Sequence, residues 1–397
     1  MIFFQVQQEN FRMVLQTPTN GGKMLKKYKI MDYDFPLVIM VIGLTIFGIM
    51  AISSANPSYV SKQTAGMVFG VVLMVFISLL DYSVLIKLYI PFYILNVALL
   101  GLVLSPLGSS TNGAQRWINL FGITFQPSEA AKILLILFYA QFIMKYKDKV
   151  KNISFVLICL ALLALPLGLI FKQPDLSTCI MVMMIFSSMI FVAGVNWKLV
   201  VFVLSVSIPS VLFIIYNAVQ EDSSILKDYQ QRRILAWLHP EEYANSEAYQ
   251  TLNSMMAIGS GQLYGKGYNT NEISSVLNGG FISESQTDFI FTVIGEEFGF
   301  IGACIVVVLI LGIAIECFMI SMRAKDKAGE VIAAGVGGWI GFQGIINIGV
   351  ATGVLPNTGL PLPFVSAGLT SLLSVYVGIG FVLNVRLQGN KYILGRG

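Results

Sequence analysis

The stretch VIAAGVGGWIGFQGIINIGVATGVLPNTGLPLPFVSAGLTSLLSVYVGIGFVLNV, Val331–Val385, contains no charged residue over 55 positions. A helix that crosses a bilayer needs about 20 apolar residues, so this stretch is long enough for two crossings. The segment Pro356–Pro363 contains three prolines and breaks the stretch where a turn between two such helices is needed. The sequence therefore predicts two membrane-spanning helices here, at 331–355 and 364–385.

The rest of the chain has the same character. Of its 397 residues, 12% are charged and 56% are hydrophobic, which excludes a soluble enzyme, a disordered chain, a collagen-like fibre and an outer-membrane barrel. Eight further spans are predicted, at 36–55, 64–80, 88–107, 127–143, 153–171, 176–193, 198–217 and 289–320. The predicted fold is therefore all-α, a polytopic membrane protein with about ten transmembrane helices and one large extracellular loop.

The basic residues predict how the chain is oriented. With the N-terminus inside, 16 Lys and Arg residues lie in the short inner segments, and only Lys62, Arg116 and Lys172 lie in the short outer loops. This bias predicts that both termini are cytoplasmic. The predicted domains are a cytoplasmic tail at 1–34, a membrane domain at 35–390 that includes a large extracellular loop at 218–287, and a cytoplasmic tail at 391–397.

Several kinds of site are not indicated. The four cysteines lie in apolar runs without a CxxC pair, and the single histidine, His239, cannot form a site with several histidine ligands. The net charge is +4 and the basic residues are scattered, so nothing indicates a nucleic-acid partner.

Ionisable residues at membrane depth are costly, and they usually face a cavity or a partner. Glu129 and Lys132 would share one face at the start of the fourth span, either as an internal ion pair or as part of a site. Asp175 lies at an outer turn, where it would be solvated or would complement the dipole of the sixth helix. Arg116 followed by Trp117 in an outer loop is typical of an interfacial anchor.

Asp288 lies where the long polar loop becomes the eighth apolar helix. Thr287 or Asp288 could simply cap that helix, which is a common role for aspartate at such a position. Glu296 and Glu297 follow two turns later, and the same loop contains Arg233, so this boundary is also a candidate for an acid/base group with a shifted pKa. The rigid turn Pro356–Ser366 has hydroxyls and open carbonyls that could line a groove for a lipid headgroup.

Together these segments resemble the SEDS family (shape, elongation, division and sporulation proteins), specifically its RodA/FtsW members. The matching motifs are Gly113–Ile118, Gln126–Glu129 with Lys132, Gln173–Leu176, Tyr229 and Gln230 with Arg233 and Ile234, Ala257–Gly261 with Gly265–Gly267, Thr287–Phe291, Glu296–Gly299 and Leu355–Ser366. The motif Thr287–Phe291 and the outer turn resemble the elongation-type RodA branch more than the division-type FtsW branch. Ala367–Ser371 departs from the Gly-Gly-Ser-Ser run that is usual in the family.

The resemblance implies a peptidoglycan glycosyltransferase in the cytoplasmic membrane of a bacterium. Such enzymes polymerise lipid II into a nascent glycan strand at the outer face, with a class B penicillin-binding protein as transpeptidase partner and with other cell-elongation machinery. Asp288 matches the family's proposed catalytic carboxylate and would act as a general base on a sugar hydroxyl. The residues expected to bind or position the substrate and its pyrophosphate are Arg116, Trp117, Glu129, Lys132, Asp175, Arg233, Thr358 and Ser366.

Two other functions stay open. A lipid II flippase would use the same charges as a translocation path, and a non-catalytic scaffold would only recruit the transpeptidase. A divalent cation, Mg²⁺ or Mn²⁺, could assist the pyrophosphate, but the sequence contains no dedicated cluster of metal ligands and indicates no other cofactor.

Overall fold

The computed structural model describes residues 33–111, 114–120, 123–220, 228–270, 275–277 and 279–394. Ten segments of these residues are helical, long and apolar enough to cross a membrane, as predicted. The third span, Tyr82–Val103, combines α4 (Tyr82–Leu85), a short 3₁₀ turn and α5 (Tyr89–Val103). The other spans contain α2 (Phe35–Ala55), α3 (Val60–Leu79), α6 (Pro127–Lys145), α7 (Ile153–Lys172), α8 (Leu176–Ala193), α9 (Trp197–Val219), α12 (Ile290–Met322), α13 (Lys327–Ala351) and α14 (Leu369–Leu394).

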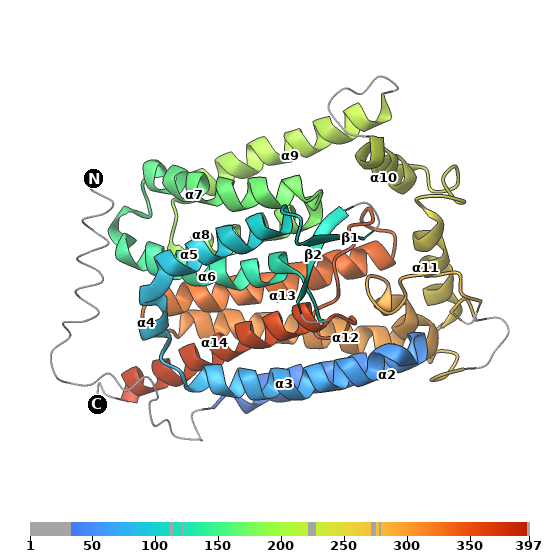
Figure 1. Ribbon diagram of the computed structural model, residues 1–397, viewed down its shortest axis with the longest axis horizontal. Coiled ribbons are helices and arrows are strands. Elements are labelled where there is room, and N and C mark those ends of the chain that lie inside the picture. Colours follow the sequence, from blue (N-terminus) through green and yellow to red (C-terminus); the bar gives the residue numbers. More distant parts are fainter. Residues whose placement is uncertain are drawn as a thin grey trace.

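The spans run along one common direction as a bundle (Figure 1). At one end lie α10 (Asp228–Leu238) and α11 (Tyr249–Ser260), which belong to the predicted extracellular loop. The start of α2 and the end of α14 lie at the opposite end. Most of the predicted tail 1–34 lies outside the described residues, and α14 continues past the predicted boundary at 390 to Leu394.

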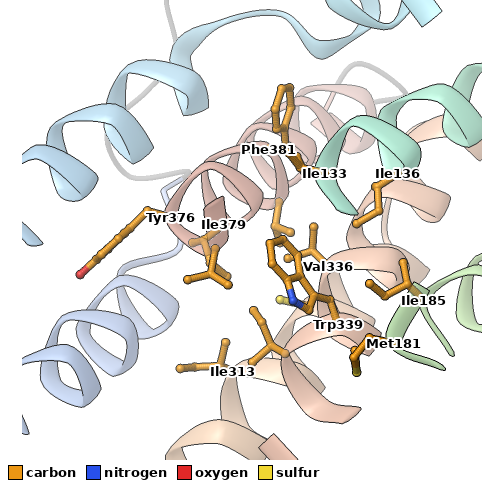
Figure 2. Packing of buried hydrophobic residues seen from close by; sticks show 14 of the residues in the cluster. Ile133, Ile136, Met181, Ile185, Ile313, Val336, Trp339, Tyr376, Ile379 and Phe381 are labelled. Carbon is orange, nitrogen blue, oxygen red and sulfur yellow. The ribbon is translucent and has the colours of Figure 1, made fainter. Parts of the chain in front are cut away.

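The core of the bundle is centred on α13. Figure 2 shows Trp339 and Val336 of this helix among apolar side chains of its neighbours. The labelled neighbours are Ile133 and Ile136 of α6, Met181 and Ile185 of α8, Ile313 of α12, and Tyr376, Ile379 and Phe381 of α14. In contrast, the most apolar part of α9 has no buried side chain among those that the structure describes, so this helix is placed to face the bilayer.

The glycines of α13 allow its neighbours to approach closely. A Cβ atom at Gly337 would lie 2.9 Å from Cys317 Cβ of α12, and one at Gly338 would lie 2.3 Å from Ser188 Oγ of α8. Small residues at such contacts let helix backbones pack together in a membrane. The Gly-rich sequence of α13 therefore serves close packing against α12 and α8.

The chain segment that joins α5 to α6 forms a small antiparallel sheet, which was not predicted from the sequence. Its strands are β1 (Gly108–Thr111), β2 (Ala114–Leu120) and β3 (Ile123–Phe125), in the order β1-β2-β3. Gly108 pairs with Ile118, and Ile118 pairs with Phe125. The third span therefore ends at Val103 and not at the predicted residue 107, because the chain turns there into the sheet.

The turn between α13 and α14 is also longer than predicted. α13 ends at Ala351 and α14 begins at Leu369, so the non-helical segment extends well beyond the prolines on both sides. This segment crosses the loop-bearing end of the bundle and contributes to the site described below.

The outer loop is anchored at a break in α12. Gly299 has a φ of +64°, which interrupts the helix and favours glycine. The Lys266 main-chain N–H donates to the carbonyl of Glu296 at 2.9 Å, and Phe300 N–H donates to the carbonyl of Gln262 at 2.8 Å. These bonds fasten the chain after α11 to both sides of the break.

Candidate active site

The backbone around Asp288, at the start of α12, is held by the turn between α13 and α14. Asn347 Nδ2 of α13 donates to the main-chain carbonyl of Asp288 at 2.7 Å and to that of Leu360 at 2.7 Å. Ser366 Oγ donates to the carbonyl of Thr287 at 2.6 Å, and Ser366 is buried. Ser366 uses its hydroxyl to position the Asp288 segment, and its contact with substrate stays a prediction.

The carboxylate of Asp288 takes no part in these contacts. The N-cap residue of α12 is Phe289, so the predicted alternative in which Asp288 caps this helix is wrong. Among the residues that the structure describes, no group forms a hydrogen bond with the carboxylate. Gly359 has a φ of +69°, which favours glycine, and it lies close against the carboxylate, because a Cβ atom there would be 3.3 Å from Asp288 Oδ2.

The surroundings of Asp288 raise the pKa of its carboxyl group to about 6. Burial is the largest cause, because it disfavours the charged form, and the negative charge of Glu284 adds to it. Arg116 and Arg233 lower this pKa, whereas Asp175 raises it slightly. At pH 7 such a group is mostly ionised, and it is a stronger base than an ordinary aspartate.

Arg116 lies at a bulge in the small sheet. Ser109 pairs with Trp117 and Ser110 pairs with Gln115, so Arg116 is an extra residue between the two pairs. A bulge of this kind re-aims a side chain. Trp117 is half-buried in the sheet, and no interaction joins it to the Asp288 segment within the described ranges.

The guanidinium of Arg116 binds the turn that begins α8. Its Nε donates to the carbonyl of Gln173 at 3.3 Å and lies 3.9 Å from Asp175 Oδ2, and its Nη2 donates to the carbonyl of Pro174. Asp175 also caps α8 by accepting a hydrogen bond from Thr178 N at 3.1 Å. The predicted helix-start role of Asp175 is confirmed, and its buried carboxylate orients Arg116.

Arg233 of α10 contacts the α13–α14 turn. It is exposed, and its Nη1 donates to the carbonyl of Asn357 at 3.4 Å, two residues before Gly359. Thr358 lies between these two residues, and its carbonyl accepts a hydrogen bond from Ser177 Oγ of α8 at 2.5 Å. The hydroxyl of Thr358 is buried and has no hydrogen-bond partner in the described part of the chain. This turn therefore connects α8 and α10 to the residues beside Asp288.

Lys132 and Glu129 form an ion pair inside the bundle. Lys132 has no exposed surface, and its Nζ donates to Glu129 Oε1 at 2.7 Å and to Gln343 Oε1 at 2.9 Å. Its ammonium lies 4.7 Å from the ring centre of Trp339. Gln343 donates in turn to the carbonyl of Pro361 at 2.7 Å. This geometry supports a positioning role for Lys132 behind the α13–α14 turn, rather than direct contact with a phosphate.

The two carboxylates inside α12 hold the outer loop. Glu296 Oε1 accepts hydrogen bonds from Lys266 Nζ and from Val276 N, each at 2.8 Å. Glu297 Oε1 accepts one from Asn269 N at 3.2 Å. Because these carboxylates are bonded to the loop, we interpret them as structural groups rather than as acid/base groups.

The sequence analysis missed three polar residues of this site. Glu284 lies four residues before Asp288 and accepts a hydrogen bond from Thr287 Oγ1 at 2.9 Å. Asn347 and Gln343, described above, are four residues apart in an apolar span, and this spacing places them on one helix face. This four-residue spacing of two polar residues in an apolar span is the feature of the sequence from which the supports of the α13–α14 turn could have been predicted.

Comparison with known proteins identifies the family. A family model described as cell cycle protein, covering FtsW, RodA and SpoVE, matches residues 29–391. The chain belongs to this family. The chain is 32% identical over 372 residues to the "Probable peptidoglycan glycosyltransferase FtsW" of Geobacter metallireducens. The match covers 90% of this chain and 96% of that protein. It is 31% identical over 380 residues to the protein of the same name from Haemophilus influenzae, covering 92% and 93%.

Two solved structures are also similar to this chain. A chain from a peptidoglycan synthase complex that coordinates polymerization and crosslinking matches with a TM-score of 0.73 and 28% identity, covering 89% of this chain and 97% of that chain. The rod shape determining protein RodA of Thermus thermophilus matches with a TM-score of 0.64 and 27% identity, covering 89% and 96%. The predicted family is therefore confirmed. Its relatives include proteins named FtsW and RodA, so the RodA branch stays a prediction.

Proposed function

We propose that this protein is a peptidoglycan glycosyltransferase that polymerises lipid II into glycan strands, with Asp288 as the general base. The observation that carries the proposal is the unbonded Asp288 carboxylate, which has a raised pKa and lies within the electrostatic influence of Arg116 and Arg233. The two relatives named as glycosyltransferases, aligned over nine-tenths of this chain, support the reaction class.

In the proposed reaction, Asp288 accepts the proton of a sugar hydroxyl as the oxygen of that hydroxyl attacks the anomeric carbon of a second substrate. The new C–O bond forms while the bond between that carbon and undecaprenyl pyrophosphate breaks. The pyrophosphate leaves with its bonding electrons, so its negative charge increases. Arg116 and Arg233 would stabilise this charge.

The buried charges favour a transferase over a flippase. A translocation path needs ionisable groups that can exchange partners with a moving substrate. Lys132 instead contacts Glu129 and Gln343, and Lys266 contacts Glu296, all within the protein. The Asp288 carboxylate, in contrast, lies just before α12 and has no hydrogen-bond partner among the described residues, so it is available to a substrate hydroxyl.

The location and partners of the protein follow from the same proposal. We infer that the loop-bearing end faces outward from the inner membrane and that both termini are cytoplasmic, because the basic residues favour that orientation. A class B penicillin-binding protein would crosslink the strands, which is supported by the similarity to a chain of a synthase complex that couples polymerization and crosslinking. A role in cell elongation would place the protein along the side wall, and a role in division would place it at the septum.

A divalent cation is also part of the proposal. Within the described residues, no three His, Cys, Asp or Glu side chains converge as a metal site. A Mg²⁺ or Mn²⁺ ion would therefore arrive with the substrate pyrophosphate, with Asp288 and Glu284 as the nearby protein carboxylates. No step of the proposed reaction depends on such an ion.

The rate of polymerisation should depend on pH through Asp288. The wild-type rate should fall as the pH decreases through about 6, because the base becomes protonated. Glu284→Gln removes a like charge and lowers the pKa of Asp288, so this fall should shift to lower pH, and the maximal rate should decrease by less than about tenfold because the base is weaker. The measurement is the initial rate of polymerisation of labelled lipid II across the pH range.

The matched control for the pH experiment is Glu241→Gln, which removes an exposed carboxylate of the same loop. Its pH profile should coincide with that of the wild type. A profile of Glu284→Gln that also coincides with the wild type would show that Glu284 does not act on the base.

Replacing Arg116 should weaken the use of lipid II. We expect Arg116→Gln to reduce kcat/KM by about 10- to 100-fold, since a hydrogen bond to a charged group contributes about 1.5–3 kcal/mol. The control is Lys62→Gln, which removes an exposed cation near the start of α3 and should leave turnover unchanged. Unchanged turnover of Arg116→Gln at limiting lipid II would rule out a contact between Arg116 and phosphate.

A further inference from the structure

A pocket lies between α10, α11 and the start of the α13–α14 turn. It contains about 510 Å³ of empty space, which includes its open mouth. Leu252 and Met255 of α11 and Leu355 of the turn give it an apolar lining. Apolar walls with a few polar groups are typical of pockets that bind small molecules or parts of larger ligands.

One wall of this pocket is the indole of Trp237 in α10. The indole is half-buried, and its Nε1 donates to the carbonyl of Gly353 at 3.2 Å. This bond ties the ring to the α13–α14 turn. The face of an aromatic ring is electron-rich, whereas the C–H groups on one face of a pyranose carry a partial positive charge. A ring that is held in place therefore suits stacking against a sugar.

Polar side chains surround the apolar lining. They are Arg233 of α10, Glu247 before α11, Thr251 of α11 and Asn357 of the turn. Sugar hydroxyls donate and accept hydrogen bonds, and an acetamido group does both as well, so a mixture of donors and acceptors matches them. A pocket for a lipid tail would not need this rim.

The pocket adjoins the Asp288 site through the turn. Arg233 Nη1 donates to the carbonyl of Asn357 at 3.4 Å, and Asn357 Oδ1 accepts a hydrogen bond from Gly359 N at 3.2 Å. Gly359 in turn lies close against the Asp288 carboxylate. Arg116 reaches the site from a different direction, from β2 and the start of α8. A reaction that joins two saccharides needs a second binding region next to the base, and the pocket is placed to provide it.

We propose that the pocket bounded by Trp237, Thr251 and Asn357 is a saccharide subsite that holds an N-acetylated sugar of the glycan strand next to Asp288. This inference rests on the proposed function and adds to it the residues that hold the carbohydrate. Trp237 supplies the stacking face. Glu247, Thr251 and Asn357 of the rim bind the hydroxyl and acetamido groups, and Arg233 stays with the pyrophosphate.

The kinetic test compares Trp237→Ala, Trp237→Phe and wild type in the polymerisation of labelled lipid II. Trp237→Ala should raise the lipid II concentration for half-maximal rate by about tenfold while kcat changes little, because it removes only binding contacts. Trp237→Phe keeps an aromatic face and loses the Nε1 hydrogen bond, so it should lie closer to wild type. Thr251→Val keeps the shape of the rim and should raise the same concentration, which provides a second test if Trp237→Ala does not fold.

The matched control is Tyr264→Ala, which removes an aromatic ring of the same loop that is 77% exposed and lies outside the pocket. It should behave as wild type. If Trp237→Ala and Thr251→Val fold and keep a normal half-saturating concentration, the inference is wrong. If they instead weaken only co-purification with the transpeptidase, the pocket is a docking site for protein, which also overturns it.

A binding measurement separates this inference from the proposed function. The probe is a tetramer of N-acetylglucosamine, observed by saturation-transfer NMR with the purified full chain. Wild type and Asp288→Asn should both bind it, and Trp237→Ala should bind it about tenfold more weakly. Equal binding by wild type and Trp237→Ala would overturn the subsite even if the protein is a polymerase. Loss of binding in Trp237→Ala would support the subsite even if polymerase activity is absent.

Discussion

Asp288→Asn should reduce the rate of glycan polymerisation by about 10²- to 10⁴-fold, because an amide cannot accept the proton that a general base removes. The substitution keeps the shape of the side chain. The bond that holds this residue in place, from Asn347 Nδ2 at 2.7 Å, goes to the main-chain carbonyl and does not involve the carboxylate. The measurement is the initial rate with labelled lipid II at pH 7, at saturating and at limiting substrate.

Folding and partner binding should be nearly unchanged in this variant, since the carboxylate forms no hydrogen bond in the part of the chain that the structure describes. Asp288→Ala should be equally inactive. Asp228→Asn, which changes an exposed aspartate of the same loop, is the matched control and should be fully active. A scaffold that only recruits a transpeptidase predicts normal polymer synthesis from Asp288→Asn, and that outcome would remove Asp288 from the mechanism.

The second large effect is expected for Lys132→Met. This change should lower the free energy of unfolding by about 3–5 kcal/mol, because it leaves a buried carboxylate without its cation. Glu129 is only 2% exposed, and its Oε2 already has no hydrogen-bond partner within the described residues. Lipid II use should decrease as well, because Gln343 loses the ammonium that helps to orient it toward the α13–α14 turn.

The measurement for this pair is the melting temperature of the purified protein in detergent. The double variant Lys132→Met with Glu129→Gln should recover part of the loss, since it removes both charges together. Lys62→Met, which changes an exposed lysine, should melt as wild type does. If Lys132→Met had the same melting temperature as wild type, the pair would not support the bundle.

Much of the fold could be predicted because the bilayer constrains the sequence. A spanning helix must be long and nearly free of charge, so runs such as Pro36–Ala55 give their position directly, and α2 begins one residue earlier. The sheet β1–β3 has no such constraint. Its strands are short and lie outside the spans, so neither hydropathy nor length indicates them.

The candidate site could be predicted only in part. Glu129 and Lys132 are three residues apart, so their pairing follows from helix geometry. The bond from Asn347 to Asp288 joins residues 59 positions apart, and it exists only because the α13–α14 turn folds back onto the start of α12. For the same reason the sequence did not distinguish Ser366, which supports this segment, from a residue that contacts substrate.

The most direct test of the proposed function uses purified protein with its cognate class B partner and labelled lipid II in detergent. Products of wild type and Asp288→Asn are compared on a gel that resolves glycan strands. We expect a ladder of strands from wild type and none from Asp288→Asn. Strands from both proteins would contradict the role of Asp288, and no strands from either, with folded protein and partner present, would contradict the transferase itself and favour a flippase.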